Sequence, residues 1–126
     1  MTAAATQTRP VTVLVVDDSE DQRLLLRRYF ERAGCIVATA STAEEAIESY
    51  RETAPHLAVV DLVLPGIDGW ELTARLRADL PTVAIAITSV LDATDYPTAD
   101  AILPKPVTGE AVRQVLRDCV PGWVQP

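Results

Sequence analysis

The sequence is poor in residues that build covalent cross-links or soft-metal sites. It contains two cysteines and one histidine among 126 residues. Two cysteines cannot form a disulfide framework, and with a single histidine the soft ligands are too few for a structural zinc site. Any metal ion bound here must therefore have oxygen ligands.

The chain also lacks a long hydrophobic run. Its longest uninterrupted apolar stretch is 83–87, and the first ten residues contain no hydrophobic segment. A membrane-spanning helix needs about 20 apolar residues, and a secretory signal needs an apolar segment of about 7–15. The sequence therefore predicts neither a membrane span nor a secretory signal, and we expect a cytoplasmic protein.

Positive charge is scarce. The chain has 18 Asp and Glu against 11 Lys and Arg, which gives a net charge of −7, and only one of the 11 is a lysine. This balance argues against binding to DNA, RNA or an anionic membrane through a basic surface. We therefore expect proteins or cations as partners, with no direct contact to nucleic acid and none to a membrane.

The apolar content is sufficient for one folded domain. Hydrophobic residues make up 48% of the chain and charged residues 23%, which is close to the average for soluble proteins and excludes a disordered chain. The length fits a single domain. We expect a flexible N-terminal arm at 1–10, the domain at 11–120 and a loose C-terminal tail at 121–126.

Strand-like and helix-like segments alternate along this domain. Short β-branched or apolar runs predict strands at 11–16, 35–39, 57–60, 83–87 and 101–103. Helical spacing predicts helices that begin near Ser19, Thr42, Trp70 and Thr108, and Glu45 completes a capping box with Thr42. The alternation predicts an α/β fold, with a doubly wound, five-stranded parallel sheet covered by helices on both faces.

Polar side chains follow four of the five predicted strands. Listed along the chain they are Asp17, Asp18, Asp61, Thr88, Ser89 and Lys105. In an open α/β sheet, ligands bind beyond the carboxyl ends of the strands, so we expect these side chains to share one site. Three converging carboxylates repel one another unless a cation neutralises them, and a few oxygen ligands with room for water favour Mg²⁺ over Ca²⁺.

Four motifs in this order resemble the receiver domains of two-component response regulators. They are VLVVDDSEDQR, VVDLVLPGIDG, AIAITS and ILPKPV, and the resemblance covers about 11–119. It implies a flavodoxin-like strand order, 2-1-3-4-5. It also implies a phosphorelay function, with a sensor histidine kinase or a histidine phosphotransfer protein as phosphoryl donor, a possible downstream protein as reader, and a conformational change as the signal.

The resemblance also implies roles for individual residues. Asp61 accepts the phosphoryl group from a phosphohistidine, and Thr88 and Lys105 contact the phosphoryl oxygens. The Mg²⁺ ligands are Asp17, Asp18, Asp61 and the main-chain carbonyl of Val63. A carboxylate is a poor nucleophile toward an anionic phosphoryl group until a metal ion and an ammonium group offset the negative charge on the phosphoryl oxygens. We expect a phosphoacceptor rather than an enzyme, with at most self-phosphorylation from small phosphodonors and self-dephosphorylation.

Two features depart from the family pattern. Only sixteen residues separate Thr88 from Lys105, which predicts a shortened or irregular fourth helix, with at most a turn or short helix around 92–96. Ile102 stands where the family commonly has an aromatic residue that moves on activation. The alternative function is therefore a receiver-like interaction module whose output does not depend on phosphorylation.

Structural alternatives exist for the same residues. Asp17 and Asp18 can simply begin a helix, and the Thr88 hydroxyl can satisfy a turn. His56 lies before the third strand, far from the acidic residues, and is interpreted as structural or solvated. A kinase or phosphatase lacks support because the chain has no Gly-rich phosphate loop. A flavodoxin-like cofactor binder lacks support because the acidic residues after the first strand would repel the phosphate of the cofactor.

Overall fold

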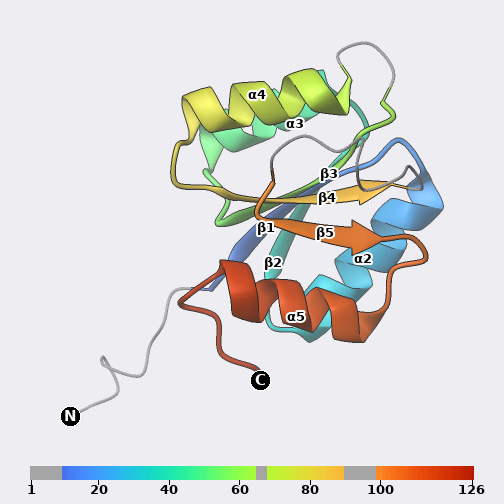
Figure 1. Ribbon diagram of the computed structural model, residues 1–126, viewed down its shortest axis with the longest axis vertical. Coiled ribbons are helices and arrows are strands. Elements are labelled where there is room, and N and C mark those ends of the chain that lie inside the picture. Colours follow the sequence, from blue (N-terminus) through green and yellow to red (C-terminus); the bar gives the residue numbers. More distant parts are fainter. Residues whose placement is uncertain (1–9, 65–67, 90–98) are drawn as a thin grey trace.

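The computed structural model describes residues 10–64, 68–89 and 99–126 (Figure 1). Five parallel strands form one sheet in the order β2-β1-β3-β4-β5, which confirms the predicted strand order. The strands are β1 (Thr12–Val16), β2 (Ile36–Ala40), β3 (Leu57–Asp61), β4 (Ala84–Ser89) and β5 (Ala101–Pro104). Their ends differ from the predicted ends by at most two residues.

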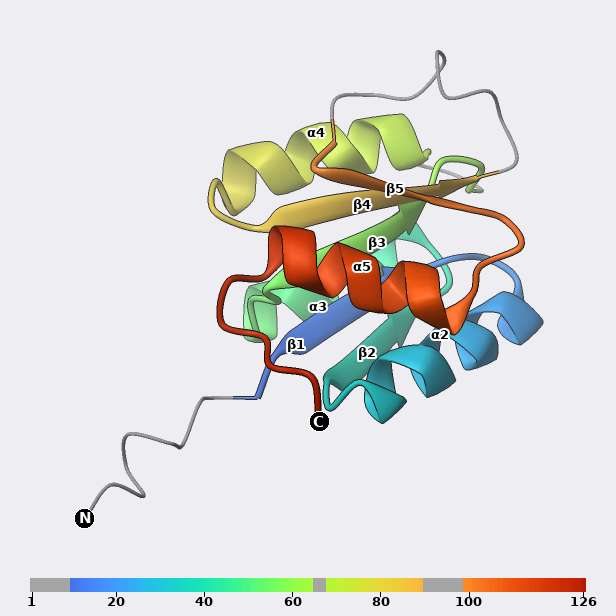
Figure 2. The ribbon, with the colours of Figure 1, turned by 60° about the horizontal axis from the view of Figure 1, so that its bottom comes forward.

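Four helices lie within the described ranges: α2 (Glu20–Arg32), α3 (Ala43–Glu52), α4 (Gly69–Asp79) and α5 (Gly109–Cys119). Helices α2 and α5 cover one face of the sheet, and α3 and α4 cover the other (Figures 1 and 2). This arrangement confirms the doubly wound fold. None of the described helices combines the length and the hydropathy needed to cross a membrane.

Each helix begins at a polar side chain that accepts a hydrogen bond from a main-chain N–H of the first turn. These capping residues are Ser19, Thr42, Asp68 and Thr108. The predicted capping box at Thr42 is only half formed. The Thr42 hydroxyl accepts from the Glu45 N–H at 3.1 Å, but the Glu45 carboxylate accepts from the N–H and hydroxyl of Ser41, one residue further back, since Ser41 offers two donors.

Alternating side chains of the central strands build two separate cores. On β1, Val13 and Val15 pack towards α2 and α5, whereas Leu14 and Val16 pack towards α3 and α4. Because successive side chains of a strand point to opposite faces, a strand buried on both faces is apolar throughout. The sheet is thereby fixed between two layers of helices, and its carboxyl edge is left for polar residues.

Two predicted segments lie outside the described residues. They are residues 1–9 of the arm predicted at 1–10, and the shortened or irregular fourth helix, whose predicted turn or short helix around 92–96 falls within the undescribed range 90–98. In the C-terminal tail at 121–126, Trp123 is half-buried and the other residues are exposed: its indole Nε1 donates a 2.7 Å hydrogen bond to the Ala33 carbonyl, and its ring contacts the core beside α2 and α5. A partly buried indole needs such an acceptor for its N–H.

Candidate functional site

The site lies at the carboxyl edge of the sheet, where the predicted residues come together. Asp17 directly follows β1, and Asp61 ends β3. The register of β3 and β4 pairs Asp61 with Thr88, so the two residues lie side by side. Lys105 directly follows β5. Residues from four strands thus meet at one place, because the strands are parallel and all end on the same side.

Lys105 is the cation of the site. Its Nζ lies 3.0 Å from Asp61 Oδ2 and 3.3 Å from Asp17 Oδ2. Burial by itself lowers the pKa of the ammonium, but the hydrogen bond to Asp61 and the charges of Asp17 and Asp61 outweigh it, so that the pKa is raised. Lys105 therefore stays positively charged and bridges two carboxylates. It is not an exposed loop lysine.

Asp17 is fully buried, and its two carboxylate oxygens differ. Oδ1 accepts a 2.9 Å hydrogen bond from the Ser19 N–H, whereas the buried Oδ2 accepts no hydrogen bond from the described residues. Desolvation and the charge of Asp61 raise the pKa of Asp17, against the opposing effects of Ser19 and Lys105. A further positive charge beside Oδ2 would relieve this cost.

The three aspartates are close enough to hold one cation. Asp17, Asp18 and Asp61 each offer a carboxylate oxygen, and these oxygens lie within 4.8 Å of one another. Asp17 and Asp61 are buried and Asp18 is exposed, so the cluster opens to solvent on one side. Few hard oxygen ligands with an open side fit Mg²⁺, which keeps several of its waters.

Thr88 and Val63 complete the surroundings of Asp61. Thr88 is fully buried, and its hydroxyl has no hydrogen-bond partner within the described part of the chain. The Val63 N–H donates to Asp61 Oδ1 at 3.0 Å, which fixes the orientation of that carboxylate, while the Val63 side chain is 59% exposed. Asp61 Oδ2 is left to face Lys105.

Sequence reasoning did not identify two residues that shape the site. Gly69 lies against the end of β3: a Cβ there would be 2.3 Å from the Asp61 carbonyl oxygen and 2.5 Å from Leu62 Cα. Arg23 donates a 2.8 Å hydrogen bond to the Asp17 carbonyl. The available signal for Gly69 was its place directly after the cap Asp68, at the start of a helix, where glycine adds no helix propensity.

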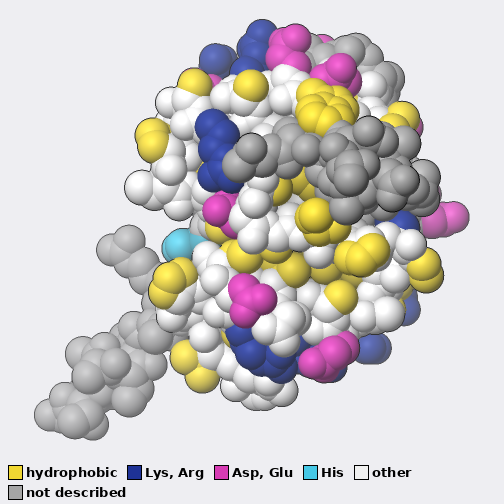
Figure 3. All heavy atoms as spheres, in the orientation of Figure 1, with side chains coloured by type: hydrophobic (Ala, Val, Ile, Leu, Met, Phe, Trp, Pro, Cys, Tyr) yellow, Lys and Arg dark blue, Asp and Glu magenta, His cyan; other side chains and the backbone are white. Residues whose placement is uncertain are grey.

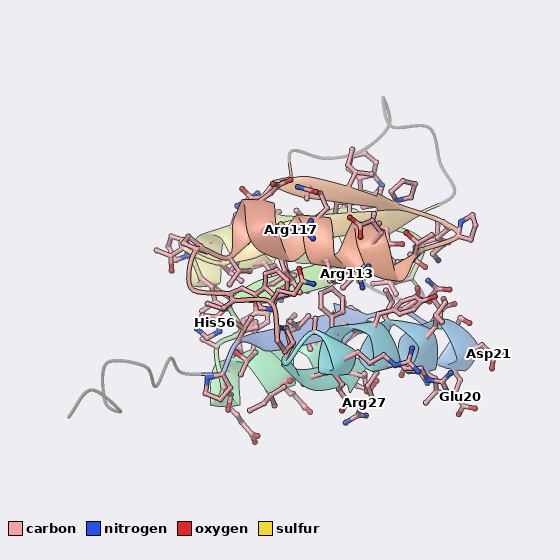
Figure 4. The ribbon with its side chains drawn as sticks, turned by 90° about the horizontal axis from the view of Figure 1, so that it is seen from below. Glu20, Asp21, Arg27, His56, Arg113 and Arg117 are labelled. Atoms are coloured by element: carbon pink, nitrogen blue, oxygen red, sulfur yellow. The ribbon has the colours of Figure 1, made fainter. Side chains whose placement is uncertain are left out.

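His56, interpreted as structural or solvated, is exposed and accepts a hydrogen bond at the far end of the sheet. Its Nδ1 accepts a 3.0 Å hydrogen bond from the Thr12 N–H at the start of β1. Figure 4 shows His56 at the opposite end of the sheet from Glu20 and Asp21, which begin the helix beside the acidic site. The single histidine therefore takes no part in the chemistry at the carboxyl edge.

Comparisons with known proteins agree with this geometry. Residues 13–117 match the family model of the response regulator receiver domain. The transcriptional regulatory protein AfsQ1 of Streptomyces coelicolor is 35% identical over 84% of this chain and 51% of its own length. An uncharacterised 14.6 kDa protein of Leptolyngbya boryana is 38% identical over 86% of this chain and 89% of its own length.

A solved structure has the same fold. The response regulator TrrA of Thermotoga maritima, in complex with Mg(2+)-BeF, aligns with a TM-score of 0.80 over 87% of this chain and 99% of its own, at 24% identity. This chain spans about half the length of AfsQ1, whose name describes a transcriptional regulatory protein. The expectation of no contact with nucleic acid gains no support from that relative.

Proposed function

Because this chain belongs to the response regulator receiver domain family, we propose that Asp61 is the residue that accepts the phosphoryl group. The observation that carries the assignment is the contact of Asp61 Oδ2 with Lys105 Nζ at 3.0 Å, beside two further aspartates. Among the three clustered carboxylates, Asp61 makes the shorter contact to Lys105, at 3.0 Å against 3.3 Å for Asp17, and it is the one paired in register with Thr88. Because the three aspartates, Thr88 and Lys105 are all present at the site, nothing favours the alternative function, a receiver-like interaction module whose output does not depend on phosphorylation.

The phosphoryl donor in this proposal is a phosphohistidine of a sensor histidine kinase or a histidine phosphotransfer protein. A carboxylate oxygen of Asp61 forms a bond to phosphorus while the bond from phosphorus to the imidazole nitrogen breaks, and the electron pair leaves with the imidazole, which takes up a proton. Lys105 and the Thr88 hydroxyl donate to the phosphoryl oxygens and offset their charge. The product is an acyl phosphate at the open edge of the sheet.

The proposed Mg²⁺ ligands are Asp17, Asp18, Asp61 and the main-chain carbonyl of Val63. When bound, the ion supplies positive charge to the phosphoryl oxygens. The Oδ2 of Asp17 is buried and, apart from its 3.3 Å ion pair with Lys105, accepts no hydrogen bond from the described residues; this and the raised pKa of that carboxyl support a cation at this place. The Mg(2+)-BeF complex of TrrA gives further support by analogy of fold.

We assign the chain a signalling role rather than an enzymatic one. Its turnover chemistry is limited to self-phosphorylation from small phosphodonors and self-dephosphorylation. A downstream protein would read the conformational change. We propose that the chain works in the cytoplasm, and its net charge of −7 supports protein partners rather than nucleic acid or membrane lipid.

Replacing Asp61 by Asn tests the assignment. Wild-type protein treated with a small phosphodonor and Mg²⁺ should gain the mass of one phosphoryl group, and Asp61→Asn should gain none, because an amide is not a nucleophile toward phosphorus. Intact-mass spectrometry measures both. Asp21→Asn removes an exposed carboxylate from the nearby helix and should be modified like wild type. Modification of Asp61→Asn at the wild-type rate would show that another residue is the acceptor.

A further inference from the structure

The strand that leads to Lys105 is held weakly by its own side chains. Strand β5 has four residues and lies at the edge of the sheet. Leu103 is its one fully buried side chain, Ile102 is 43% exposed, and Pro104 has no N–H to donate. Figure 3 shows hydrophobic side chains exposed between α4 and α5, where β5 lies. Such a strand needs an additional anchor to hold the residue that follows it.

Asp100, the residue before β5, supplies contacts to three neighbouring elements. Its N–H donates to the Ile85 carbonyl at 2.8 Å, and its Oδ2 accepts from the Ile85 N–H at 2.8 Å. The same Oδ2 accepts from the Arg77 guanidinium of α4 at 3.2 Å. Its carbonyl accepts a 3.9 Å contact from the Cys119 thiol of α5. Asp100 therefore ties β4, α4 and α5 to the point where β5 begins.

The carboxylate replaces a strand partner that β5 does not provide. The pairing of β4 with β5 begins at Ala86 and Ala101, so Ile85 lies one residue before the first pair. Ile85 is fully buried, and both of its main-chain groups are bonded by Asp100. Loss of the carboxylate would leave the Ile85 N–H buried and unbonded, which is a costly state for a main-chain donor.

We propose that Asp100 is a positioning residue that sets the place of Lys105 at the phosphorylation site. On the C-terminal side, buried Val107 and the Thr108 cap fix the start of α5. On the N-terminal side, Asp100 fixes the start of β5, so that the ammonium of Lys105 is held between two anchors. The proposal rests on the proposed function of Asp61 and Lys105, because its consequence is a correctly placed contact to the phosphoryl group.

The test compares two substitutions at Asp100. Asp100→Ala removes the acceptor for the Ile85 N–H and should slow phosphorylation by a small phosphodonor about tenfold or more, because small misplacements of a group at a reacting centre are costly. Amide hydrogen exchange over 101–105 should become faster. Mg²⁺ affinity should stay within about twofold of wild type, since the proposed ligands lie on other strands. Asp100→Asn keeps an oxygen for the Ile85 N–H and should restore most of the rate.

Tyr50→Phe is the matched control. The Tyr50 hydroxyl donates to Asp79 Oδ2 and joins α3 to α4, so its loss lowers stability without touching β5. This variant should keep the wild-type phosphorylation rate. An unchanged rate in Asp100→Ala, or an equal loss in Tyr50→Phe, would overturn the positioning role. If the wild-type protein takes up no phosphoryl group, the proposed function is contradicted instead. In that case amide hydrogen exchange tests Asp100 independently: an unchanged exchange rate over 101–105 in Asp100→Ala would show that Asp100 does not anchor β5.

Discussion

At the scale of single residues, the buried carboxylate of Asp17 contributes to the proposed site but lowers the stability of the metal-free fold. Desolvation raises its pKa, and the charge of Asp61 adds to this effect. A carboxyl with a raised pKa binds its proton more tightly in the folded than in the unfolded protein. Its contribution to the free energy of unfolding therefore falls as pH rises from below the unfolded pKa to above the folded one. Ionisation of Asp17 is therefore less favourable in the folded metal-free protein than in the unfolded chain, which lowers the free energy of unfolding above this pH range.

Neutralising the two adjacent aspartates should therefore stabilise the metal-free fold. The variant with both Asp17→Asn and Asp18→Asn should melt several degrees above wild type at neutral pH without Mg²⁺. The gain should shrink as pH falls, because wild-type Asp17 then becomes neutral too. Mg²⁺ should raise the melting temperature of wild type by preferential binding to the folded state, and it should not change that of the variant. Calorimetry with and without MgCl₂ measures both effects.

The control for this experiment removes the same number of charges nearby. Glu20→Gln with Asp21→Asn changes two exposed carboxylates in the first turn of α2, outside the acidic cluster. This control should keep the Mg²⁺ response of wild type. A Mg²⁺-dependent shift that persists in the Asp17 and Asp18 variant would contradict the proposed ligands.

At the scale of elements, the turn from β3 into α4 depends on a close approach between two main-chain segments. The Gly69 N–H donates to the Leu62 carbonyl at 3.1 Å, and the Gly69 Cα packs against the last residue of β3. No side chain fits at this place, since a Cβ would overlap main-chain atoms that cannot move aside. The start of α4 and the position of Asp61 are thereby coupled.

Gly69→Ala should disrupt this turn. We expect a loss of about 2–3 kcal/mol in the free energy of unfolding, because the added methyl group forces the main chain apart. The Mg²⁺-dependent rise in melting temperature should also be lost as Asp61 is displaced. Urea denaturation with and without Mg²⁺ checks both expectations.

Gly109→Ala is the matched control for that substitution. Gly109 also begins a helix, but the nearest atom to an added Cβ is the flexible Arg113 side chain at 3.4 Å. Its free energy of unfolding should stay within about 0.5 kcal/mol of wild type, with a small gain from helix propensity. Equal losses at both glycines would show that the contact with Asp61 is not what makes Gly69 necessary.

At the scale of the whole molecule, two buried groups link stability to alkaline pH. Burial raises the pKa of the Cys35 thiol to about 11. Burial, together with the hydrogen bond to Asp79, raises the pKa of Tyr50 to about 12. Cys35 belongs to the core beside α2 and α5, and Tyr50 to the core beside α3 and α4. The two layers of the fold are therefore expected to respond to high pH together.

Stability should fall as pH rises through this range. Both groups keep their protons in the folded state beyond the pH at which the unfolded chain loses them, so the stabilising contribution is full below about pH 9 and is lost between about pH 9 and 12. Each shift corresponds to about 2–3 kcal/mol. Urea unfolding followed over this range should show a clearly weaker pH dependence in the variant with Cys35→Ala and Tyr50→Phe. The same slope in wild type and variant would contradict these assignments.

The sequence by itself determined the order of the elements and the residues that meet at the carboxyl edge. Apolar runs and caps such as Ser19 and Thr108 are local signals, because burial and first-turn hydrogen bonds act within one element. Parallel strands end on the same side, so Asp17, Asp61 and Lys105 could be placed together before any contact was known. The strand order followed from the family resemblance and is the one observed.

The tertiary structure alone decided the contacts between distant segments. Asp100, which precedes β5, is hydrogen-bonded to Ile85 of the neighbouring strand β4, and Gly69 packs against the end of β3. Trp123 donates a hydrogen bond to the carbonyl of Ala33, which lies 90 residues away in the sequence. Neither the Asp100 contact nor the Trp123 contact leaves a periodic or capping signal in the sequence, and for Gly69 the place after the cap Asp68 does not reveal its contact with β3. Each depends on which main-chain donors, acceptors and free volume the folded layers bring together, and those are fixed only when the whole domain has packed.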